Sequence, residues 1–373
     1  MFRFLVFCLV LWPAVALADG YPIGTPDTIF EGNNRIGAFR AWDKLFPVHN
    51  VARGKTVSDL PEGVPITLPK RVAGFLTRSE ATGLIVLKDG AIRYEGHWLG
   101  ADRRSRFTSM SLAKSFTSVL FGMALKDGLI KSVDDPLTDY LPDLKGSGYD
   151  GVPLSALLQM SSGVAFDEPP GSYGDALAFW TDTAVHHDTA MSAWAKRLPQ
   201  AKPPFSTFKY NGVDSAVLGL VVMQATGKTL AEYFSEKIWQ PAGMEDDASW
   251  GLDGAGNELP YCCVNARLRD YARLGRFLME DESLKPWMVE SSKPHRSSLA
   301  PGQLYPGYPL GYGYQWWLAE DGYMGHGANG QFLYLDPKRN LVIVLTSAWA
   351  SPWDYGLEYE AYDAFVGLAQ AVK

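Results

Sequence analysis

The sequence has few of the residues that build metal sites and disulfide frameworks. Its 373 residues include three cysteines and six histidines. Cys262 and Cys263 are adjacent, and Cys8 lies in the apolar N-terminal stretch. Two neighbouring cysteines with no further Cys or His beside them do not make a zinc site. We therefore expect no metal and no disulfide framework, and we expect two buried thiols at positions 262 and 263 rather than a strained vicinal disulfide.

An excess of positive charge is also missing. The formal net charge is -7, which argues against a nucleic-acid partner and against a polybasic membrane patch. The chain shows no internal repeat and no low-complexity tract. With 47% hydrophobic and 20% charged residues, it has the composition of a globular protein with a large core.

Only the N-terminus carries a long uninterrupted apolar run. Arg3 precedes the apolar residues 4–12, and the small-residue ending Ala16-Leu17-Ala18 follows. These are the features of a signal peptide cleaved after Ala18. The run is too short for a comfortable membrane span. We predict a signal peptide over residues 1–18, and a secreted or periplasmic protein with no stable membrane anchor after cleavage.

Hydrophobic periodicity predicts strands near both ends of the chain and helices between them. Residues 82–100 form two apolar runs around the turn Asp89-Gly90, and residues 330–348 form a second predicted hairpin with its turn at 336–340. Predicted helices cover residues 111–127, 154–160, 215–226, 265–279 and 354–372. We therefore expect an α+β fold, with one antiparallel sheet built from both termini and flanked by helices, and a mostly helical lobe.

The predicted domain organisation follows from this pattern. Residues 19–75 are rich in Gly, Pro and Asn and are expected to form an N-terminal arm. Residues 76–373 are expected to form one domain. Its sheet region covers about 76–110 and 310–373, and its helical lobe covers about 128–300.

A serine and a lysine at the start of the predicted helix 111–127 suggest covalent chemistry. Lys114 follows Ser111 by three residues, so the two side chains lie on one helix face. Because the helix is otherwise apolar, Lys114 should face inward, where burial lowers its pKa and lets the neutral amine accept the serine proton. Ser109 is the expected helix cap. The helix N-terminus places N–H groups near a developing oxyanion. We predict that Ser111 is a nucleophile and Lys114 its general base.

Five segments, in order along the chain, carry a resemblance to a known family. They are SLAKS from Ser111, DGLIKSVDDPLTDYLPDL from Asp127, LLQMSSG from Leu157, FKYNGVDSAVLGLVVMQATGKTLAEYFSEKIWQPAGM from Phe208, and GHGANGQFLYLDP from Gly325. The chain resembles the serine β-lactamase and penicillin-binding-protein superfamily in its class C-like branch, and within it the 6-aminohexanoate-dimer (nylon oligomer) hydrolases and related esterases. This resemblance implies a β-lactamase/transpeptidase-like fold and an acyl-enzyme on Ser111, with no metal or organic cofactor.

The resemblance assigns Tyr210 to the tyrosine of the family's Tyr-x-Asn motif. That phenol shuttles a proton among the nucleophile, the lysine and the leaving group. A nearby lysine ammonium would favour its phenolate. The motif is altered here, because Asn211 directly follows Tyr210 and Gly212 stands at the usual asparagine position. A lactam-gripping asparagine is therefore not expected.

The family's Lys-Thr-Gly motif is replaced by Gly325-His-Gly-Ala328. The resemblance places the second oxyanion N–H, beside that of Ser111, on Ala328, or on Asn329 if the register shifts by one residue. It makes His326, Gly327 and Asn329 candidate substrate-binding residues. His326 either polarises the substrate or hydrogen-bonds to Tyr210, or it supports the glycine-rich turn. Loss of the Lys-Thr-Gly cation argues against a β-lactam carboxylate as the natural ligand.

Two further binding candidates come from the nylon-oligomer hydrolase branch. Those enzymes carry an amide-assisting tyrosine shortly after a segment that matches MSSGVAFDE here. The first tyrosine after that segment in this chain is Tyr173, which follows Pro169-Pro170. Asn265 stands where that branch lines its pocket, and it could equally cap the predicted helix 265–279.

The sequence therefore predicts a serine hydrolase that cleaves a small linear amide or a carboxylic ester. Two alternatives remain: a β-lactamase or D,D-peptidase acting on peptidoglycan-like substrates, and a catalytically silent binding protein of the same fold. A Ser-His-Asp hydrolase is disfavoured, because no serine lies in a G-x-S-x-G turn.

Overall fold

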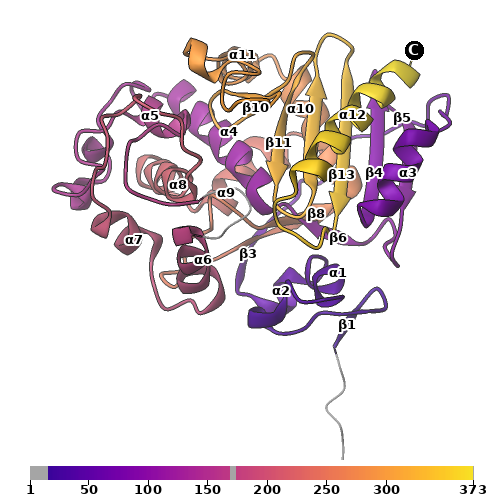
Figure 1. Ribbon diagram of the computed structural model, residues 1–373, viewed down its shortest axis with the longest axis horizontal. Helices are drawn as coiled ribbons and strands as arrows, with labels where there is room; N and C mark the ends of the chain where they lie inside the picture. Colours follow the sequence, from indigo (N-terminus) through magenta and orange to yellow (C-terminus); the bar gives the residue numbers. More distant parts are fainter. Residues whose placement is uncertain (1–15, 169–173, 373) are drawn as a thin grey trace, which may run out of the picture.

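A seven-stranded antiparallel sheet forms the largest layer of the protein (Figure 1). The computed structural model describes residues 16–168 and 174–372. The sheet has the strand order β5-β4-β13-β12-β11-β10-β9. Its strands are β4 Ala81–Lys88, β5 Ala91–His97, β9 Gly311–Tyr312, β10 Trp317–Leu318, β11 Tyr323–Gly327, β12 Gln331–Asp336 and β13 Leu341–Ser347. β4 pairs with β13, so the predicted sheet built from both ends of the chain is confirmed.

Helices cover both faces of this sheet. Residues of β13 alternate between two cores: Val342 and Val344 face one, and Ile343 and Leu345 face the other. Helix α10 (Leu268–Glu280) packs on the first face, whereas α3 (Lys70–Arg78) and α12 (Tyr355–Ala371) pack together on the second (Figure 1). Burial on both faces explains why the central strands are almost continuously apolar.

The predicted helical lobe lies beside the sheet (Figure 1). Its helices are α4 Ala113–Lys126, α5 Leu154–Leu158, α6 Gly174–Trp180, α7 Met191–Arg197, α8 Gly212–Thr226, α9 Leu230–Phe234 and α11 Lys285–Ser291. Helix α4 packs against α8 on the lobe side and contacts β11 on the sheet side. The nucleophile candidate therefore lies where the two layers meet.

The structure also contains a second sheet, whose strands hydrophobic periodicity did not predict. This four-stranded sheet has the order β3-β7-β8-β6. Its strands are β3 Val48–Val51, β6 Arg106–Thr108, β7 Ala248–Gly251 and β8 Val264–Arg267. Three or four residues are too few to show a two-residue period, so these strands leave little signal in the sequence. The segment 19–75 contributes β3 to this sheet, the short helices α1 (Asn34–Ala38) and α2 (Trp42–Leu45), and one strand of the hairpin β1 (Leu17–Ala18)–β2 (Tyr21–Pro22).

Two predicted helix starts are wrong. The helix predicted over 265–279 begins at Leu268, because residues 264–267 pair as β8; Asn265 is therefore not its cap. Ser109 does not cap α4 with its side chain, because its hydroxyl accepts a hydrogen bond from the N–H of Val264 at 3.0 Å. Both residues are used in strand contacts instead.

The N-terminal prediction falls mostly outside the described residues. Of the predicted signal peptide 1–18, only residues 16–18 are described, and they belong to the β1–β2 hairpin. Within residues 16–168 and 174–372, no helix combines the length and the apolar character that crossing a membrane requires.

Asp214 in α8 links three segments of the helical lobe through hydrogen bonds. Its Oδ1 accepts hydrogen bonds from the hydroxyls of Tyr149 and Ser162, both at 2.8 Å, and from the side-chain amide of Asn211 at 3.1 Å. The side chain is completely buried, and burial raises its pKa from 3.8 to about 7. The folded state therefore holds this proton more tightly than the unfolded state.

The raised pKa of Asp214 predicts a pH-dependent stability. A group whose pKa is raised on folding stabilises the protein below its unfolded pKa, and that contribution is lost as pH rises through the folded pKa. Asp214→Asn keeps the side-chain shape but has no proton to lose. The difference between the urea midpoints of unfolding of the wild type and this variant should therefore decrease as the pH is raised from 4 to 8. Asp143→Asn, at an exposed position, is the control. A difference that stays constant over this range would contradict the prediction.

Candidate active site

Ser111 lies in a tight turn between a strand and a helix. Strand β6 ends at Thr108, and a 3-10 turn over Met110–Leu112 leads directly into α4. Met110 has a left-handed backbone with φ of 45°, which is uncommon for a residue with a side chain. The turn presents Ser111 to a cavity of about 390 Å³.

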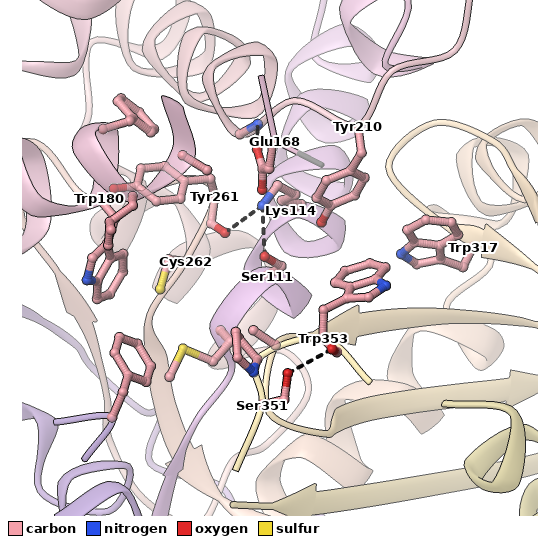
Figure 2. A pocket seen from close by; sticks show the side chains of 18 of the residues that line it. Ser111, Lys114, Glu168, Trp180, Tyr210, Tyr261, Cys262, Trp317, Ser351 and Trp353 are labelled. Atoms are coloured by element: carbon pink, nitrogen blue, oxygen red, sulfur yellow. Dashed lines mark hydrogen bonds between the residues drawn. The ribbon is translucent and has the colours of Figure 1, made fainter. Parts of the chain in front are cut away.

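Lys114 is buried against Ser111. Its Nζ donates hydrogen bonds to Oγ of Ser111 at 2.9 Å and to the carbonyl oxygen of Tyr261 at 3.1 Å (Figure 2). Only 2% of the residue is exposed. Burial lowers the pKa of Lys114 to about 8, although the charge of Glu168 acts in the opposite direction. At pH 7 about one molecule in ten therefore carries the neutral amine. The expectation that Lys114 faces inward with a lowered pKa is confirmed.

Tyr210 lies on the other side of the same pair. Its ring centroid is 4.9 Å from Nζ of Lys114, and its side chain lines the same cavity as Ser111. The expectation that its phenolate is favoured is wrong. Burial raises the pKa of Tyr210 well above its usual range, and the charge of Glu168 raises it further. Tyr210 is therefore a neutral phenol, which can donate its proton while its oxygen accepts a hydrogen bond.

Two glycines let strand β11 lie directly against the Ser111 turn. A Cβ at position 327 would lie 2.3 Å from the carbonyl oxygen of Ser109 and 3.0 Å from the backbone nitrogen of Ser111. A Cβ at Gly325 would lie 2.1 Å from a methyl group of Leu112. The Gly-His-Gly sequence is thus a requirement of this close contact. It brings Ala328, the residue after the strand, into the wall of the cavity that holds Ser111.

Other predicted binding residues use their polar groups elsewhere. Asn329 donates its N–H to Pro352 and its side-chain amide to Trp349, so its N–H is not free for an oxyanion. Asn265 donates its side-chain amide to the carbonyl oxygen of Cys263. Among the described residues, neither lines the cavity, and Gly327 also lies outside the lining.

His326 does not line the cavity in the described part of the chain. Its ring stacks on Phe332 with centroids 4.3 Å apart, and its Nδ1 lies 3.2 Å from a carboxylate oxygen of Glu358 in α12. This position favours the supporting role over direct contact with the substrate. Tyr173 lies outside the described residues.

The expectation of two free thiols at positions 262 and 263 is wrong, because the structure joins Cys262 and Cys263 in a vicinal disulfide. Adjacent side chains on an extended strand point to opposite faces. Cys263 departs from that geometry with φ of 76°. The bond joins immediate neighbours, so it crosslinks no distant segments. Cys262 lines the cavity beside Tyr261.

The cavity wall is mainly aromatic. Its aromatic residues are Phe30, Phe179, Trp180, Tyr210, Tyr261, Tyr305, Tyr308, Trp317, Trp353 and Tyr355. Among the described lining residues, Lys114 and Glu168 alone are charged. No group of three or more His, Cys, Asp or Glu side chains in the described part of the chain is arranged to hold a metal ion. Sequence reasoning assigned no role to Glu168, although this residue ends the MSSGVAFDE segment, and it missed Tyr261, which falls in no motif with a chemical signature.

Comparison with known proteins identifies the family. Residues 70–366 match the profile of the family described as beta-lactamase. The chain belongs to the beta-lactamase family. It is a serine hydrolase, and the predicted family, fold and enzyme class are confirmed.

The relatives of this chain differ in how much of its length they match. A 6-aminohexanoate-dimer hydrolase of Paenarthrobacter ureafaciens is 28% identical over 90% of both chains. A D-alanyl-D-alanine-carboxypeptidase/endopeptidase of Escherichia coli strain K12 is 26% identical over 49% of this chain and 51% of that protein.

Solved structures show the same fold. A Bacillus anthracis structure described as a candidate 6-aminohexanoate-dimer hydrolase superposes with a TM-score of 0.82 at 22% identity, covering 93% of this chain and 96% of that one. The hydrolase EstCE1, described as having promiscuous acyltransferase activity, has a TM-score of 0.64 at 15% identity, covering 79% of this chain and 97% of that one.

The close contact at Gly327 predicts the effect of a single methyl group. In Gly327→Ala, the new Cβ meets a backbone carbonyl that cannot rotate away, so β11 must move from Ser111. A shift of about 1 Å at such a site costs about 100-fold in rate, and kcat for a p-nitrophenyl ester should fall by that much. Gly367→Ala in α12, where the Cβ makes an ordinary 3.6 Å contact, is the control. Equal rates in the two variants would contradict this account.

Proposed function

We propose that this enzyme hydrolyses small linear amides or carboxylic esters through an acyl-enzyme on Ser111, with Lys114 as general base and Tyr210 as proton shuttle. The observation that carries the proposal is the hydrogen bond from the buried amine of Lys114 to Oγ of Ser111 at 2.9 Å. The ring of Tyr210 lies 4.9 Å from the same amine and lines the cavity with Ser111. A serine next to a base of lowered pKa is the arrangement that covalent catalysis needs.

In the acylation step, Oγ of Ser111 loses its proton to neutral Lys114 and forms a bond to the carbonyl carbon of the substrate. The N–H groups of Ser111 and Ala328 stabilise the oxyanion. Tyr210 then gives its proton to the leaving nitrogen or oxygen and regains one from Lys114, while the bond to the leaving group breaks. Water repeats the sequence on the acyl-enzyme, releases the acid and restores Ser111.

The lining of the cavity supports the choice of substrate class. Aromatic walls suit an apolar acyl or leaving group. Apart from Lys114, the described lining residues supply no cation that would pair with the carboxylate of a β-lactam or a D-alanyl peptide. The relative named as a 6-aminohexanoate-dimer hydrolase supports a linear amide. The Escherichia coli relative keeps a peptidoglycan-like substrate as the second candidate.

A substrate panel tests this proposal. Wild type and Ser111→Ala should be compared on p-nitrophenyl esters, linear ω-amino-acid amides, D-Ala-D-Ala peptides and nitrocefin. We expect turnover of esters or linear amides, and a loss of at least about 10³-fold in Ser111→Ala because the variant cannot form the acyl-enzyme.

Covalent labelling by a fluorophosphonate should occur in the wild type and be absent in Ser111→Ala. Faster turnover of nitrocefin or D-Ala-D-Ala peptides than of any ester or linear amide would favour the peptidoglycan alternative. A wild type that neither turns over a substrate nor becomes labelled would favour the silent binding protein. Activity retained in Ser111→Ala would sink the proposed mechanism.

We also propose that the enzyme is exported and that residues 1–18 are removed. Support comes from the N-terminal pattern of Arg3, the apolar residues 4–12 and the small-residue ending Ala16-Leu17-Ala18.

Expression of the full chain in a Gram-negative host tests this export. The mature protein should be found outside the cytoplasm, and N-terminal sequencing should begin at Asp19. Ala18→Arg, which removes the small residue before the cleavage site, should block processing. An unprocessed cytoplasmic protein would contradict export.

A further inference from the structure

Glu168 occupies space that Gly212 leaves open. Gly212 stands where the family's Tyr-x-Asn motif has its asparagine. A Cβ at this position would lie 3.1 Å from Oε2 of Glu168, which is closer than most real contacts. With no side chain at 212, the backbone N–H of Gly212 donates a hydrogen bond to the same oxygen at 2.6 Å. The absence of a side chain at position 212 therefore makes room for the Glu168 carboxylate, and the backbone of Gly212 holds it there.

The held carboxylate points at Lys114. Figure 2 shows Glu168 on one side of the Lys114 amine and Ser111 on the other. The remaining groups around the amine carry no formal charge: the carbonyl oxygen of Tyr261 at 3.1 Å and the rings of Tyr210 and Tyr261 at 4.9 and 5.7 Å. Within the described lining of the cavity, Glu168 is the sole anionic side chain.

A buried ammonium requires a nearby negative charge. When Lys114 takes the proton of Ser111, an O–H bond breaks, an N–H bond forms, and a full positive charge appears on a side chain that is almost completely buried. Such a charge is strongly destabilising unless it is paired. The neutral groups around Lys114 offer dipoles, whereas Glu168 offers a counter-charge.

We propose that Glu168 is a positioning residue for Lys114, held by Gly212 in the place of the missing asparagine, and that it stabilises the ammonium formed during acylation. This inference rests on the proposed function, in which Lys114 is the base. Glu168 contacts no reacting atom itself and acts through Lys114.

The surrounding electrostatics agree with this role. Burial raises the pKa of Glu168, while the charge of Lys114 and the N–H of Gly212 lower it. The same carboxylate raises the pKa of Lys114 against the effect of burial, and it raises the pKa of Tyr210. One carboxylate therefore strengthens the base and keeps the neighbouring phenol protonated. Asp214 lies further along α8, and the charge of Glu168 adds to the rise of its pKa.

The test is the pH dependence of kcat/KM for a p-nitrophenyl ester in wild type, Glu168→Gln and Glu168→Asp. The wild-type rate should rise with pH around the Lys114 pKa of about 8. Removing the negative charge lowers the pKa of Lys114, so the midpoint in Glu168→Gln should move down by about one pH unit or more. The rate on the high-pH plateau should also fall, because the ammonium loses its counter-charge. Glu168→Asp keeps the charge and should keep a midpoint near that of the wild type.

A variant at Gly212 tests the position of the Glu168 carboxylate without changing Glu168 itself. Gly212→Ala places a Cβ against Oε2 of Glu168 and should displace the carboxylate, moving the midpoint in the same direction by a smaller amount. In the double variant with Glu168→Gln, the alanine should add no further shift. This variant keeps the test informative even where Glu168→Gln does not fold.

Matched controls separate this role from a structural one. Asp167→Asn removes the preceding, exposed carboxylate, which pairs with Lys209, and should leave the midpoint unchanged. A midpoint that stays fixed or rises in both Glu168→Gln and Gly212→Ala, while Ser111→Ala is inactive, overturns the role of Glu168 and leaves the proposed function standing. Activity that persists in Ser111→Ala overturns both.

Discussion

The contact between strand β11 and the turn that carries Ser111 fixes the relative position of the sheet and the helical lobe. Gly325 and Gly327 allow it, because any side chain there would collide with α4 or with the turn before it. Hydroxyl groups along α4 extend the contact. Ser115 and Ser118 donate to the carbonyl oxygens of Gln315 and Tyr314, both at 2.7 Å. One face of α4 is thus joined by hydrogen bonds to the connection between β9 and β10, and the cavity lies at the N-terminal end of this helix.

A second constraint is electrostatic. In the proposed mechanism, Lys114 loses its proton near neutral pH, which burial favours, and carries a positive charge during the reaction. Among the described residues, a carbonyl group and aromatic rings surround the amine, and Glu168 is the one carboxylate that lines the cavity with it. Desolvation is the larger effect, since the pKa of Lys114 lies below its usual value despite Glu168. The net result is a base that titrates close to physiological pH.

Local sequence patterns predicted the elements that obey them. The two hairpins, α4, α8 and α12 follow from periodicity and turn residues, and the sheet built from both termini follows from their order. The lowered pKa of Lys114 was also predictable, because a lysine in an apolar helix has to be buried there. Ser109 and Asn265 were misread as caps, since Val264, the partner of Ser109, and Asn265 itself belong to β8, a strand too short to show a period.

Properties that depend on contacts between distant segments of the chain could not be predicted from local sequence patterns. The protonation state of Tyr210 depends on burial and on Glu168, which lies about 40 residues earlier in the chain; its place in the MSSGVAFDE segment does not reveal that it lies near Tyr210. The vicinal disulfide depends on the backbone twist at Cys263. The roles assigned to Ser111, Lys114, Tyr210 and Ala328 remain predictions.

The pairing of β4 with β13 also has a consequence for how the molecule is made. Thr82 and Thr346, which share a hydrogen bond in this part of the sheet, are 264 residues apart in the chain. Contacts over such separations form slowly, because a long loop must close before they give any stabilisation. The central strand pair therefore cannot assemble until nearly the whole polypeptide has been synthesised. Under the export proposed above, this topology would postpone folding until the C-terminal strand has also crossed the membrane.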